Sequence, residues 1–303
     1  MPGAKAGDHY KYEIETAKGD ILSKADPFAF MSVKRPGTDS IVTELWYEWH
    51  DQEWMKAREM NNSFTSPMNI YECHLGSWKR PEGEERFYSY RELAEMLVPY
   101  VKDMGYTHVE FLPVMEHPLD ASWGYQVSGF YAPTSRYGSA HGLKHLIEAF
   151  HKEGIGVILD WVPGHFCKDD QGLRMFDGIN LYESDNEQRA ENKGWGTTNF
   201  DYGRTEVKSF LISNALFWME EYHFDGFRFD GVTSMLYHDH ALGTNFSSLD
   251  MYFTMNTDVE AVTYLQLANE LIREVRPGAL TIAEDMSGMP GMCEPVKDGG
   301  IGF

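Results

Sequence analysis

From about residue 67 the sequence alternates between short apolar runs and longer amphipathic segments, and this alternation limits the folds open to the chain. The apolar runs have the composition of strands and occupy residues 70–75, 108–114, 155–162, 224–229 and 280–283. The segments between them place apolar residues at helical spacing, at residues 91–104, 143–150, 207–222 and 261–275. Repetition of strand and helix predicts parallel strands joined by right-handed crossovers. A (β/α)8 barrel and a doubly wound sheet both satisfy the pattern.

The distribution of polar residues favours the barrel. Polar and charged side chains follow several different apolar runs, and the C-terminal strand ends of a barrel meet in one site. A complete barrel takes roughly 250 residues, whereas about five to six strands can be counted here. We therefore expect an incomplete (β/α)8 TIM barrel over residues 67–303. Residues 166–205 are polar and glycine-rich and predict an inserted loop region, and residues 300–303 resemble the start of a further strand.

The first 50 residues have a different, strand-like pattern. Apolar and polar residues alternate around Tyr12, and Gly19 lies in a sequence that suits a hairpin turn. Residues 41–49 form a second aromatic, β-like stretch. So few strands do not make a stable sheet alone, so we expect part of a β-module whose beginning is missing. Residues 51–66 are polar, with Asn-Asn-Ser at 61–63, and predict a linker.

Charge and cysteine content exclude several classes of protein. The formal charge is −21, from 47 acidic and 26 basic residues, and it repels phosphate backbones and anionic lipids. Because of this charge we expect no nucleic-acid partner. No run of 18 apolar residues is present, so we expect no membrane partner either. The three cysteines form no C-x-x-C pair, and the N-terminus has no signal segment. These features predict a cytoplasmic protein, or a plastid one if the source is a plant or alga.

Two of the apolar runs end in carboxylates. The segment 226–231 reads GFRFDG, and the segment 281–285 reads TIAED. Residues i and i+2 of a strand share a face, so Arg228 can keep the carboxylate of Asp230 ionised. Retaining glycoside chemistry needs an ionised nucleophile and a second carboxyl group that protonates the leaving oxygen. Asp230 and Glu284 suit these two roles, and we expect their oxygens to lie within about 7 Å of each other.

Other strand ends contribute further candidates. Trp123 and Tyr125 follow the run at 108–114, and Asp160 and His165 lie at the end of the run at 155–162. Each residue type also has a structural explanation, because an Asp can cap a helix, an Arg–Asp pair can serve stability, and aromatic rings can pack in the core. A helix cap is the interpretation we give to the acid at position 285. Acidic groups at three strand ends, with an Arg, a His and aromatic rings, favour a catalytic site.

These segments resemble known sequence motifs. The first three motifs of the α-amylase superfamily are similar to DWVPGH at 160–165, GFRFD at 226–230 and AED at 283–285. The chain further resembles the glycogen and starch branching enzymes, at YECHLGSW (71–78), WGYQV (123–127), FYAPTSRYG (130–138) and FDGVTSM (229–235). Hydrolytic amylases tend to carry a Lys-His pair shortly after the nucleophile, and this chain has none there.

The resemblance implies a role for each matched residue. Asp230 would be the nucleophile, Glu284 the general acid/base, and Arg228 the group that keeps the nucleophile charged. Asp160 and His165 would contact the sugar beside the cleaved bond, and Tyr125 would stack on it. Trp123 would also bind substrate. Residues 1–50 would be the latter part of a β-sandwich glucan-binding module. No cofactor and no metal are implied.

The implied reaction cuts an α-1,4 link of glycogen, amylose or amylopectin and passes the cut chain to a 6-hydroxyl. We expect the protein to be a monomer. A fourth motif of the family, a His-Asp pair whose Asp stabilises the transition state, has no match. His238 and Asp239 lie only a few residues after Asp230, in the same loop, and do not replace it. We therefore expect a chain truncated at both ends, poorly stable and with little branching activity. An α-glucan hydrolase and an inactive glucan-binding fragment remain alternatives.

Overall fold

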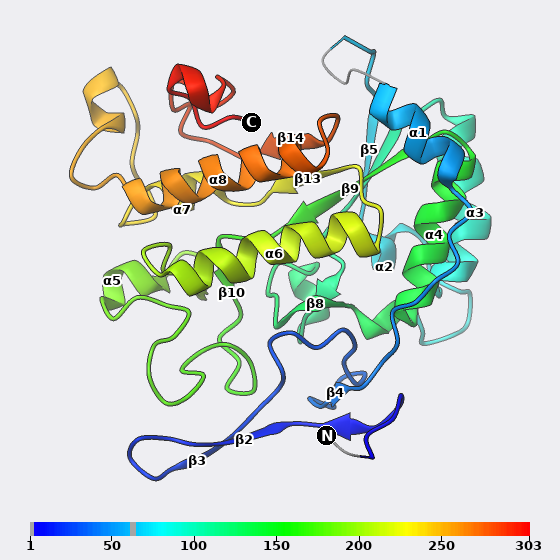
Figure 1. Ribbon diagram of the computed structural model, residues 1–303, viewed down its shortest axis with the longest axis horizontal. Helices are drawn as coiled ribbons and strands as arrows, with labels where there is room; N and C mark the ends of the chain where they lie inside the picture. The colour runs from blue at the N-terminus through cyan, green and yellow to red at the C-terminus, as the bar shows by residue number, and fades with distance from the viewer. Residues whose placement is uncertain (1–2, 61–64) are drawn as a thin grey trace.

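The computed structural model describes residues 3–60 and 65–303, so Asn61, Asn62 and Ser63 of the predicted linker lie outside the described residues. A five-stranded parallel sheet lies at its centre (Figure 1). The strands are β5 (Ile70–Cys73), β6 (His108–Phe111), β9 (Gly156–Trp161), β13 (Gly226–Phe229) and β14 (Leu280–Ala283). Their order in the sheet, β14-β13-β9-β6-β5, follows the order of the chain without the reversal of a doubly wound sheet. The sheet is therefore part of a barrel, as predicted.

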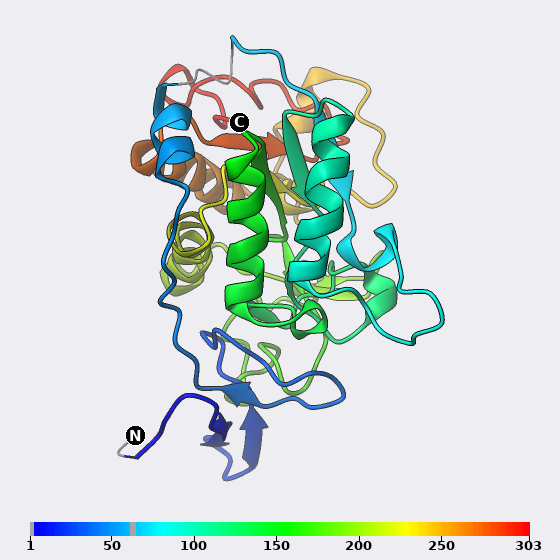
Figure 2. The same cartoon turned by 90° about the vertical axis from the view of Figure 1, so that its right-hand side faces the viewer.

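Long helices cover the outer face of this sheet. They are α3 (Tyr90–Asp103), α4 (Ala140–Lys152), α6 (Thr205–Glu221) and α8 (Val259–Val275). Helices α3 and α4 lie side by side (Figure 2), and α3 begins with a capping box in which Ser89 and Glu92 satisfy each other's backbone N–H groups. All six residues of β9 are buried, as expected for a strand covered on both faces.

Short elements connect these layers. They are α2 (Leu75–Trp78), β7 (Met115–Glu116), β8 (Gly129–Pro133), α7 (Val232–Leu236), and the 3-10 turns η1 (Asp120–Ser122), η2 (Ser135–Tyr137), η3 (Leu249–Tyr252) and η4 (Val296–Asp298). The strand expected at 300–303 is not formed. The N–H groups of Ile301 and Phe303 instead donate to the carbonyls of Gly291 and Met292, in the preceding turn. Phe303 packs edge-on against Phe229 of β13, with ring centroids 5.0 Å apart.

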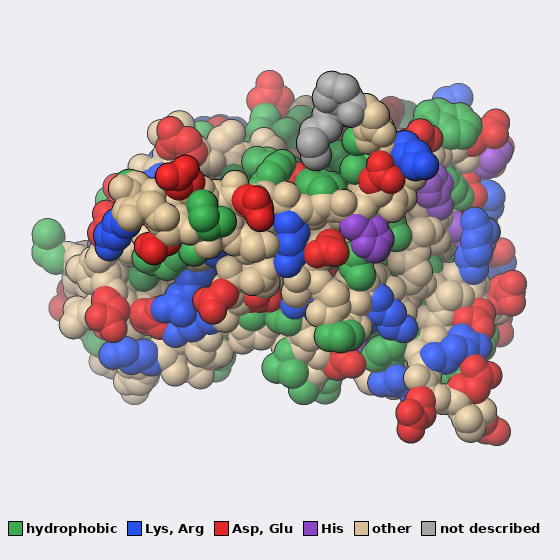
Figure 3. All heavy atoms as spheres, turned by 90° about the horizontal axis from the view of Figure 1, so that it is seen from below, with side chains coloured by type: hydrophobic (Ala, Val, Ile, Leu, Met, Phe, Trp, Pro, Cys, Tyr) green, Lys and Arg blue, Asp and Glu red, His purple; other side chains and the backbone are tan. Residues whose placement is uncertain are grey.

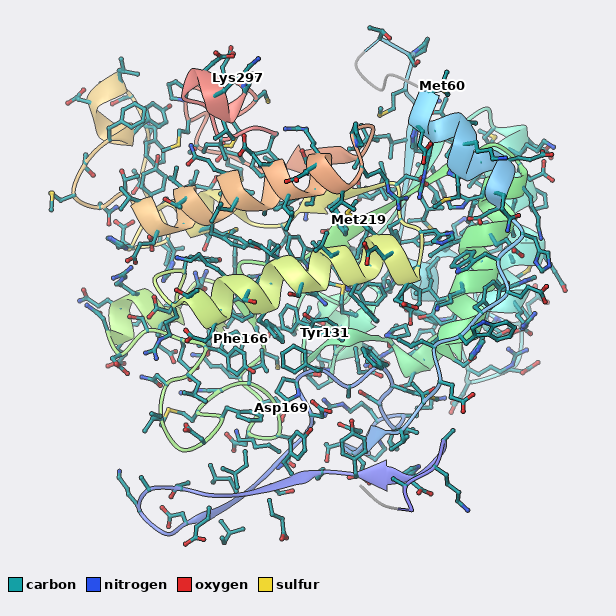
Figure 4. All side chains as sticks on the ribbon, viewed as in Figure 1. Met60, Tyr131, Phe166, Asp169, Met219 and Lys297 are labelled. Atoms are coloured by element: carbon teal, nitrogen blue, oxygen red, sulfur yellow. The ribbon has the colours of Figure 1, made fainter. Side chains whose placement is uncertain are left out.

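The N-terminal segment forms four short strands, β1 (His9–Tyr10), β2 (Tyr12–Glu15), β3 (Ile21–Lys24) and β4 (Ser40–Ile41). The predicted hairpin is present, because β2 and β3 pair in antiparallel fashion around a turn in which Gly19 has φ +85°. The segment rests on the barrel below Tyr131 and Asp169 (Figure 4). There the ring of Phe28 packs against Tyr131, and Arg35 binds Asp169 at 3.1 Å.

The expected strand at 41–49 was wrong beyond Ile41. The backbone of this stretch is bound by side chains of α4 instead of a partner strand. Lys144 Nζ donates to the carbonyl of Leu45 at 2.6 Å, and His141 Nε2 lies 2.9 Å from the carbonyl of Trp46. This aromatic, alternating segment therefore lies along α4 instead of pairing as a strand, because side chains of α4 bind its backbone carbonyl groups.

The predicted linker contains a helix, α1 (Gln52–Met60). No residue of α1 is fully buried, and its attachment to the barrel is polar. Trp54 Nε1 and Arg58 Nη1 donate to Asp225 Oδ1 at 3.0 and 2.6 Å, at the N-terminal end of β13. The segment is therefore attached to the N-terminal end of the sheet, and it does more than connect two regions.

The inserted region is more ordered than a loop. It holds a small antiparallel sheet of β10 (His165–Phe166), β12 (Thr197–Asn199) and β11 (Glu191–Asn192), with the short helix α5 (Glu187–Ala190). On the face of the molecule drawn in Figure 3, acidic and basic side chains are interspersed. Within residues 3–60 and 65–303, no helix has the length and apolar character needed to cross a bilayer.

Candidate active site

Asp230 and Glu284 lie at neighbouring positions at the C-terminal ends of β13 and β14. The two strands pair in parallel with Phe229 opposite Ala283, so the next residue on each strand is a carboxylate. The N–H of Glu284 donates to the carbonyl of Phe229 at 3.0 Å, which continues the ladder one step further. The N–H of Gly231 donates to Glu284 Oε2 at 3.0 Å. The carboxylate of Glu284 is thus held against the backbone directly after Asp230.

The carboxylate of Asp230 has a different partner on each oxygen. Arg228 Nη1 donates to Oδ1 at 2.6 Å, and His165 Nε2 lies 3.3 Å from Oδ2. Burial alone would raise the pKa of Asp230, but the hydrogen bond and charge of His165, together with Arg228, hold it below its usual value. Asp230 is therefore ionised, which a nucleophilic carboxylate requires.

Asp160, on the neighbouring strand β9, binds the same guanidinium group. Arg228 lies opposite Asp160 in the register, and its Nη1 donates to Asp160 Oδ1 at 2.9 Å. The hydroxyl of Tyr125 donates to Asp160 Oδ2 at 2.6 Å. Burial raises the pKa of Asp160 well above its ordinary value in spite of Arg228. One guanidinium therefore lies between two carboxyl groups whose pKa values are displaced in opposite directions, a pattern typical of active sites.

The structure brings together all but one of the residues singled out from the sequence. Trp123 makes none of the hydrogen bonds of this cluster. Its indole is 55% exposed and stacks on His74, with centroids 5.9 Å apart, beside the cluster. It is connected to the cluster through the chain, two residues before Tyr125.

Three acidic or basic residues near the carboxylates have structural partners. Asp285 does not cap a helix, contrary to our expectation; its oxygens accept from Thr233 Oγ1 at 2.6 Å and from the N–H of Gly288 at 2.9 Å, and they hold a turn. His238 Nδ1 lies 3.3 Å from an oxygen of Asp258. Asp239 accepts from the side chain of an asparagine, at position 256, in the same loop. The pair at 238–239 is thus engaged away from the two carboxylates.

Trp195 belongs to the site but was missed by sequence reasoning. Its ring centroid lies 5.1 Å from that of His165, and a Cβ atom placed on Gly231 would lie 2.9 Å from Trp195 Cη2. The indole is nevertheless 45% exposed. Buried Asn192 accepts from the N–H groups of Gly194 and Trp195 and so fixes the loop. The only signal in the sequence is a lone tryptophan between two glycines of the inserted region, which is too weak to single out.

The described residues hold no group of three or more His, Cys, Asp or Glu side chains arranged to bind a metal ion. The cluster itself offers two carboxylates beside a guanidinium, an imidazole and aromatic rings.

The chain is similar to a known family and to solved structures. The family model of the alpha amylase catalytic domain matches residues 93–189. Two solved structures share the fold: a putative alpha amylase from Salmonella typhimurium (TM-score 0.66, 24% identity, 93% of this chain and 41% of that one), and a pullulanase complexed with maltotriose from Anoxybacillus sp. LM18-11 (TM-score 0.68, 22% identity, 94% and 41%). The chain therefore has the fold of an amylase-type barrel, with a carboxylate pair at the C-terminal strand ends, and residues 93–189 match the alpha amylase catalytic domain.

Along its whole length the sequence aligns with branching enzymes. It is 52% identical over its whole length to the 1,4-alpha-glucan branching enzyme GlgB 1 of Clostridium perfringens (strain 13 / Type A), and 51% identical to the 1,4-alpha-glucan branching enzyme GlgB of Corynebacterium efficiens. The chain spans 45% and 40% of the lengths of these two relatives. The resemblance seen in the sequence motifs is thus confirmed along the full chain.

Proposed function

We propose that the chain carries the catalytic carboxylates of a 1,4-alpha-glucan branching enzyme, acting on an α-1,4-glucan such as glycogen, amylose or amylopectin. One observation carries the proposal: Asp230 is held ionised by His165 and Arg228, directly beside a second carboxylate, Glu284, on the next strand. We assign residues 67–303 to the catalytic barrel and residues 1–50 to the latter part of a β-sandwich glucan-binding module.

The geometry supports a double displacement. Asp230 attacks the anomeric carbon, and the glycosidic bond breaks as Glu284 gives its proton to the leaving oxygen. The glucan chain is then held as an ester on Asp230. In the second step, Glu284 takes the proton from an incoming 6-hydroxyl, whose oxygen displaces Asp230 and forms the α-1,6 branch. Arg228 stabilises the charge that returns to Asp230, and Asp160 and Tyr125 would bind the sugar that is transferred.

The experiment that tests this assignment replaces each carboxylate with its amide. In the chain completed with the C-terminal remainder of the Clostridium perfringens relative, Asp230→Asn and Glu284→Gln should each reduce turnover of amylose by about 10²–10⁴-fold or more, because each removes a group that acts in both steps. Asp239→Asn and Glu274→Gln are matched controls, since both acids lie outside the cluster, and they should leave the rate unchanged. An unchanged rate in either cluster variant would contradict the assignment.

The fate of the ester separates the transferase from a hydrolase. If water replaced the 6-hydroxyl, new reducing ends would appear without new 1,6 links. We expect the number of new 1,6 links, measured by proton NMR of the product glucan, to equal the number of 1,4 bonds cleaved. A rise in reducing ends alone would favour the hydrolase. A binding protein would be favoured if the wild type showed no turnover and Asp230→Asn still bound the glucan.

A further inference from the structure

A cavity of about 200 Å³ opens at the N-terminal end of the sheet, away from the catalytic carboxylates. Helix α1 and the end of α8 lie side by side there (Figures 1 and 2). The lining comes from α1, from the turn after α8 and from the starts of several strands, and it includes Trp54, Arg58, Met68, His108, Asp225 and Arg276. Asp225 precedes β13 and Asp230 follows it, so five residue steps of about 3.3 Å, roughly 17 Å, separate the cavity from the nucleophile.

Arg58 brings a buried positive charge to this cavity. Its side chain is only 9% exposed. Its Nη1 donates to Asp225 Oδ1 at 2.6 Å and to the carbonyl of His223 at 3.0 Å. Its Nη2 is buried and has no acceptor among the described residues. A buried donor without an acceptor costs free energy, and a charged donor costs more than a neutral one. The guanidinium of Arg58 therefore keeps an N–H group that requires a partner.

Arg276 brings a second guanidinium group with the same property. It caps the C-terminus of α8, where its backbone N–H donates to the carbonyl of Ile272 at 2.9 Å. Its Nη1 is buried and finds no acceptor within the described part of the chain. Two guanidinium groups with unpaired N–H bonds thus line one cavity. The planar fork of an arginine matches the oxygens of a phosphate or a carboxylate.

The carboxylate of Asp225 does not balance both of these cations. Its oxygens lie 2.6–3.0 Å from four donors: Arg58 Nη1, Trp54 Nε1, His151 Nε2 and the N–H of Val157. Burial alone would raise the pKa of Asp225, but His151 and Arg58 hold it well below its usual value, so the group is ionised. Burial lowers the pKa of His108 below 6.5, so its ring is neutral at pH 7. The lining therefore carries two positive charges and one negative charge, in a chain whose formal charge is −21.

We propose that this cavity binds a phosphoryl group, either as free phosphate or as the phosphate of a small monoester. A phosphate has several acceptor oxygens, so it can accept from Arg58 and Arg276 at the same time. The cavity is several times larger than the roughly 30 Å³ that one water molecule occupies in the liquid, which leaves room for a small organic group beside Met68 and Trp54. This inference does not rest on the proposed function. The N-terminal end of a barrel serves stability, so the ligand acts on the fold and not on the sugar chemistry.

Isothermal titration calorimetry of the 303-residue chain with inorganic phosphate and with glycerol 3-phosphate, at constant ionic strength, tests the site. We expect saturable binding, although the net charge of the chain disfavours non-specific uptake of anions. Arg276→Gln should weaken the binding about tenfold or more, because it removes a charged hydrogen-bond donor. Arg276→Lys keeps the charge without the planar fork, so it should restore only part of the affinity. Arg91→Gln removes the same charge from an exposed position of α3 and should leave both affinities unchanged.

The two anions distinguish the sources of the phosphoryl group. Tighter binding of glycerol 3-phosphate would identify a monoester as the ligand, and equal affinities would identify free phosphate; both results support the site. A bound anion also stabilises the folded chain, so the thermal transition measured by circular dichroism should rise with phosphate concentration, and rise less in Arg276→Gln. The site would be overturned if neither anion bound saturably to the wild type, or if Arg276→Gln bound both as tightly as the wild type does.

Discussion

At the scale of single residues, Arg228 is the cation that Asp160 and Asp230 share, and at Asp230 its effect on the pKa follows that of His165. Its Nη1 lies within hydrogen-bonding distance of both Asp160 and Asp230. A cation at this distance favours the ionised form of a carboxylate, typically by one to three pH units. Which of the two acids remains charged is decided by burial and by His165, and Asp230 is the one whose pKa is lowered.

This predicts a pH effect of Arg228→Gln. With the guanidinium removed, the pKa of Asp230 rises, so the nucleophile becomes protonated at a higher pH. The acid limb of kcat/KM, measured with an α-maltosyl fluoride, should move upward by about one to three pH units. Arg228→Lys keeps the charge and should move it less. An acid limb that stays in place in Arg228→Gln would exclude this role.

Gly231 is a second residue whose identity the geometry requires. Its φ is +66°, and a Cβ atom would lie within 2.9 Å of Trp195. Gly231→Ala should therefore cost the backbone strain of about 1–2 kcal/mol plus a displacement of the indole. Gly154→Ala is the control, because Gly154 has φ +72° and open space around it. We expect a larger loss of stability in urea unfolding, and a change in tryptophan fluorescence, only for Gly231→Ala; equal effects would show that the contact with Trp195 is unimportant.

The polar candidates could be predicted from the sequence because each follows a recognisable strand and belongs to a motif. Trp195 could not, because its importance depends on His165 and Gly231, which are distant along the chain. Nor could the turn held by Asp285, since a helix cap and a turn use the same hydrogen bonds to backbone N–H groups.

At the scale of elements, the helices with an apolar stripe were predictable, and the polar attachment of α1 was not. Besides Trp54 and Arg58 of α1, Asp225 is bound by His151 Nε2 of α4 at 3.0 Å, and His151 Nδ1 reaches Asp51 at 2.7 Å. These partners come from three segments far apart in the sequence. No local sequence pattern predicts such a network, although it links α1 and α4 to the residue that precedes β13, at the N-terminal end of the sheet.

The network predicts a pH-dependent stability. Burial alone would lower the pKa of His151, but Asp225 and Asp51 raise it above its ordinary value of 6.5. A raised pKa adds stability below pH 6.5, and this contribution is lost as the pH rises through the folded-state value. His151→Gln should therefore cost about 3–5 kcal/mol at pH 6 and clearly less at pH 9, measured by urea unfolding. His145→Gln, on the same helix, is the control: burial lowers the pKa of His145, so its cost should not be larger at pH 6 than at pH 9. A cost for His151→Gln that is independent of pH would contradict the argument.

At the scale of the whole molecule, the described sheet has five strands, whereas a closed (β/α)8 barrel has eight. Within the described residues, β5 and β14 each pair with one strand only. The alternation of the sequence predicted this architecture well, because strand order in a barrel simply follows chain order. Burial at the chain's last residues was not predictable, since it depends on Phe229 beneath them.

An open sheet of this kind should be weakly stable and slow as a branching catalyst. We expect the 303-residue chain to show little change of the iodine spectrum of amylose and an early thermal transition by circular dichroism. A chimera that adds the C-terminal remainder of the Clostridium perfringens relative should raise both the transition temperature and the activity. Near-full activity of the 303-residue chain alone would refute this expectation.

The most direct measurement is to trap the ester on the nucleophile. Glu284→Gln, incubated with α-maltosyl fluoride, should retain the first step, because fluoride leaves without a proton, and should be slow in the second. Peptide mass spectrometry is expected to find a maltosyl group on Asp230 and none in Glu284→Gln combined with Asp230→Asn. A label on any other residue, or no label on Asp230, would contradict the central claim.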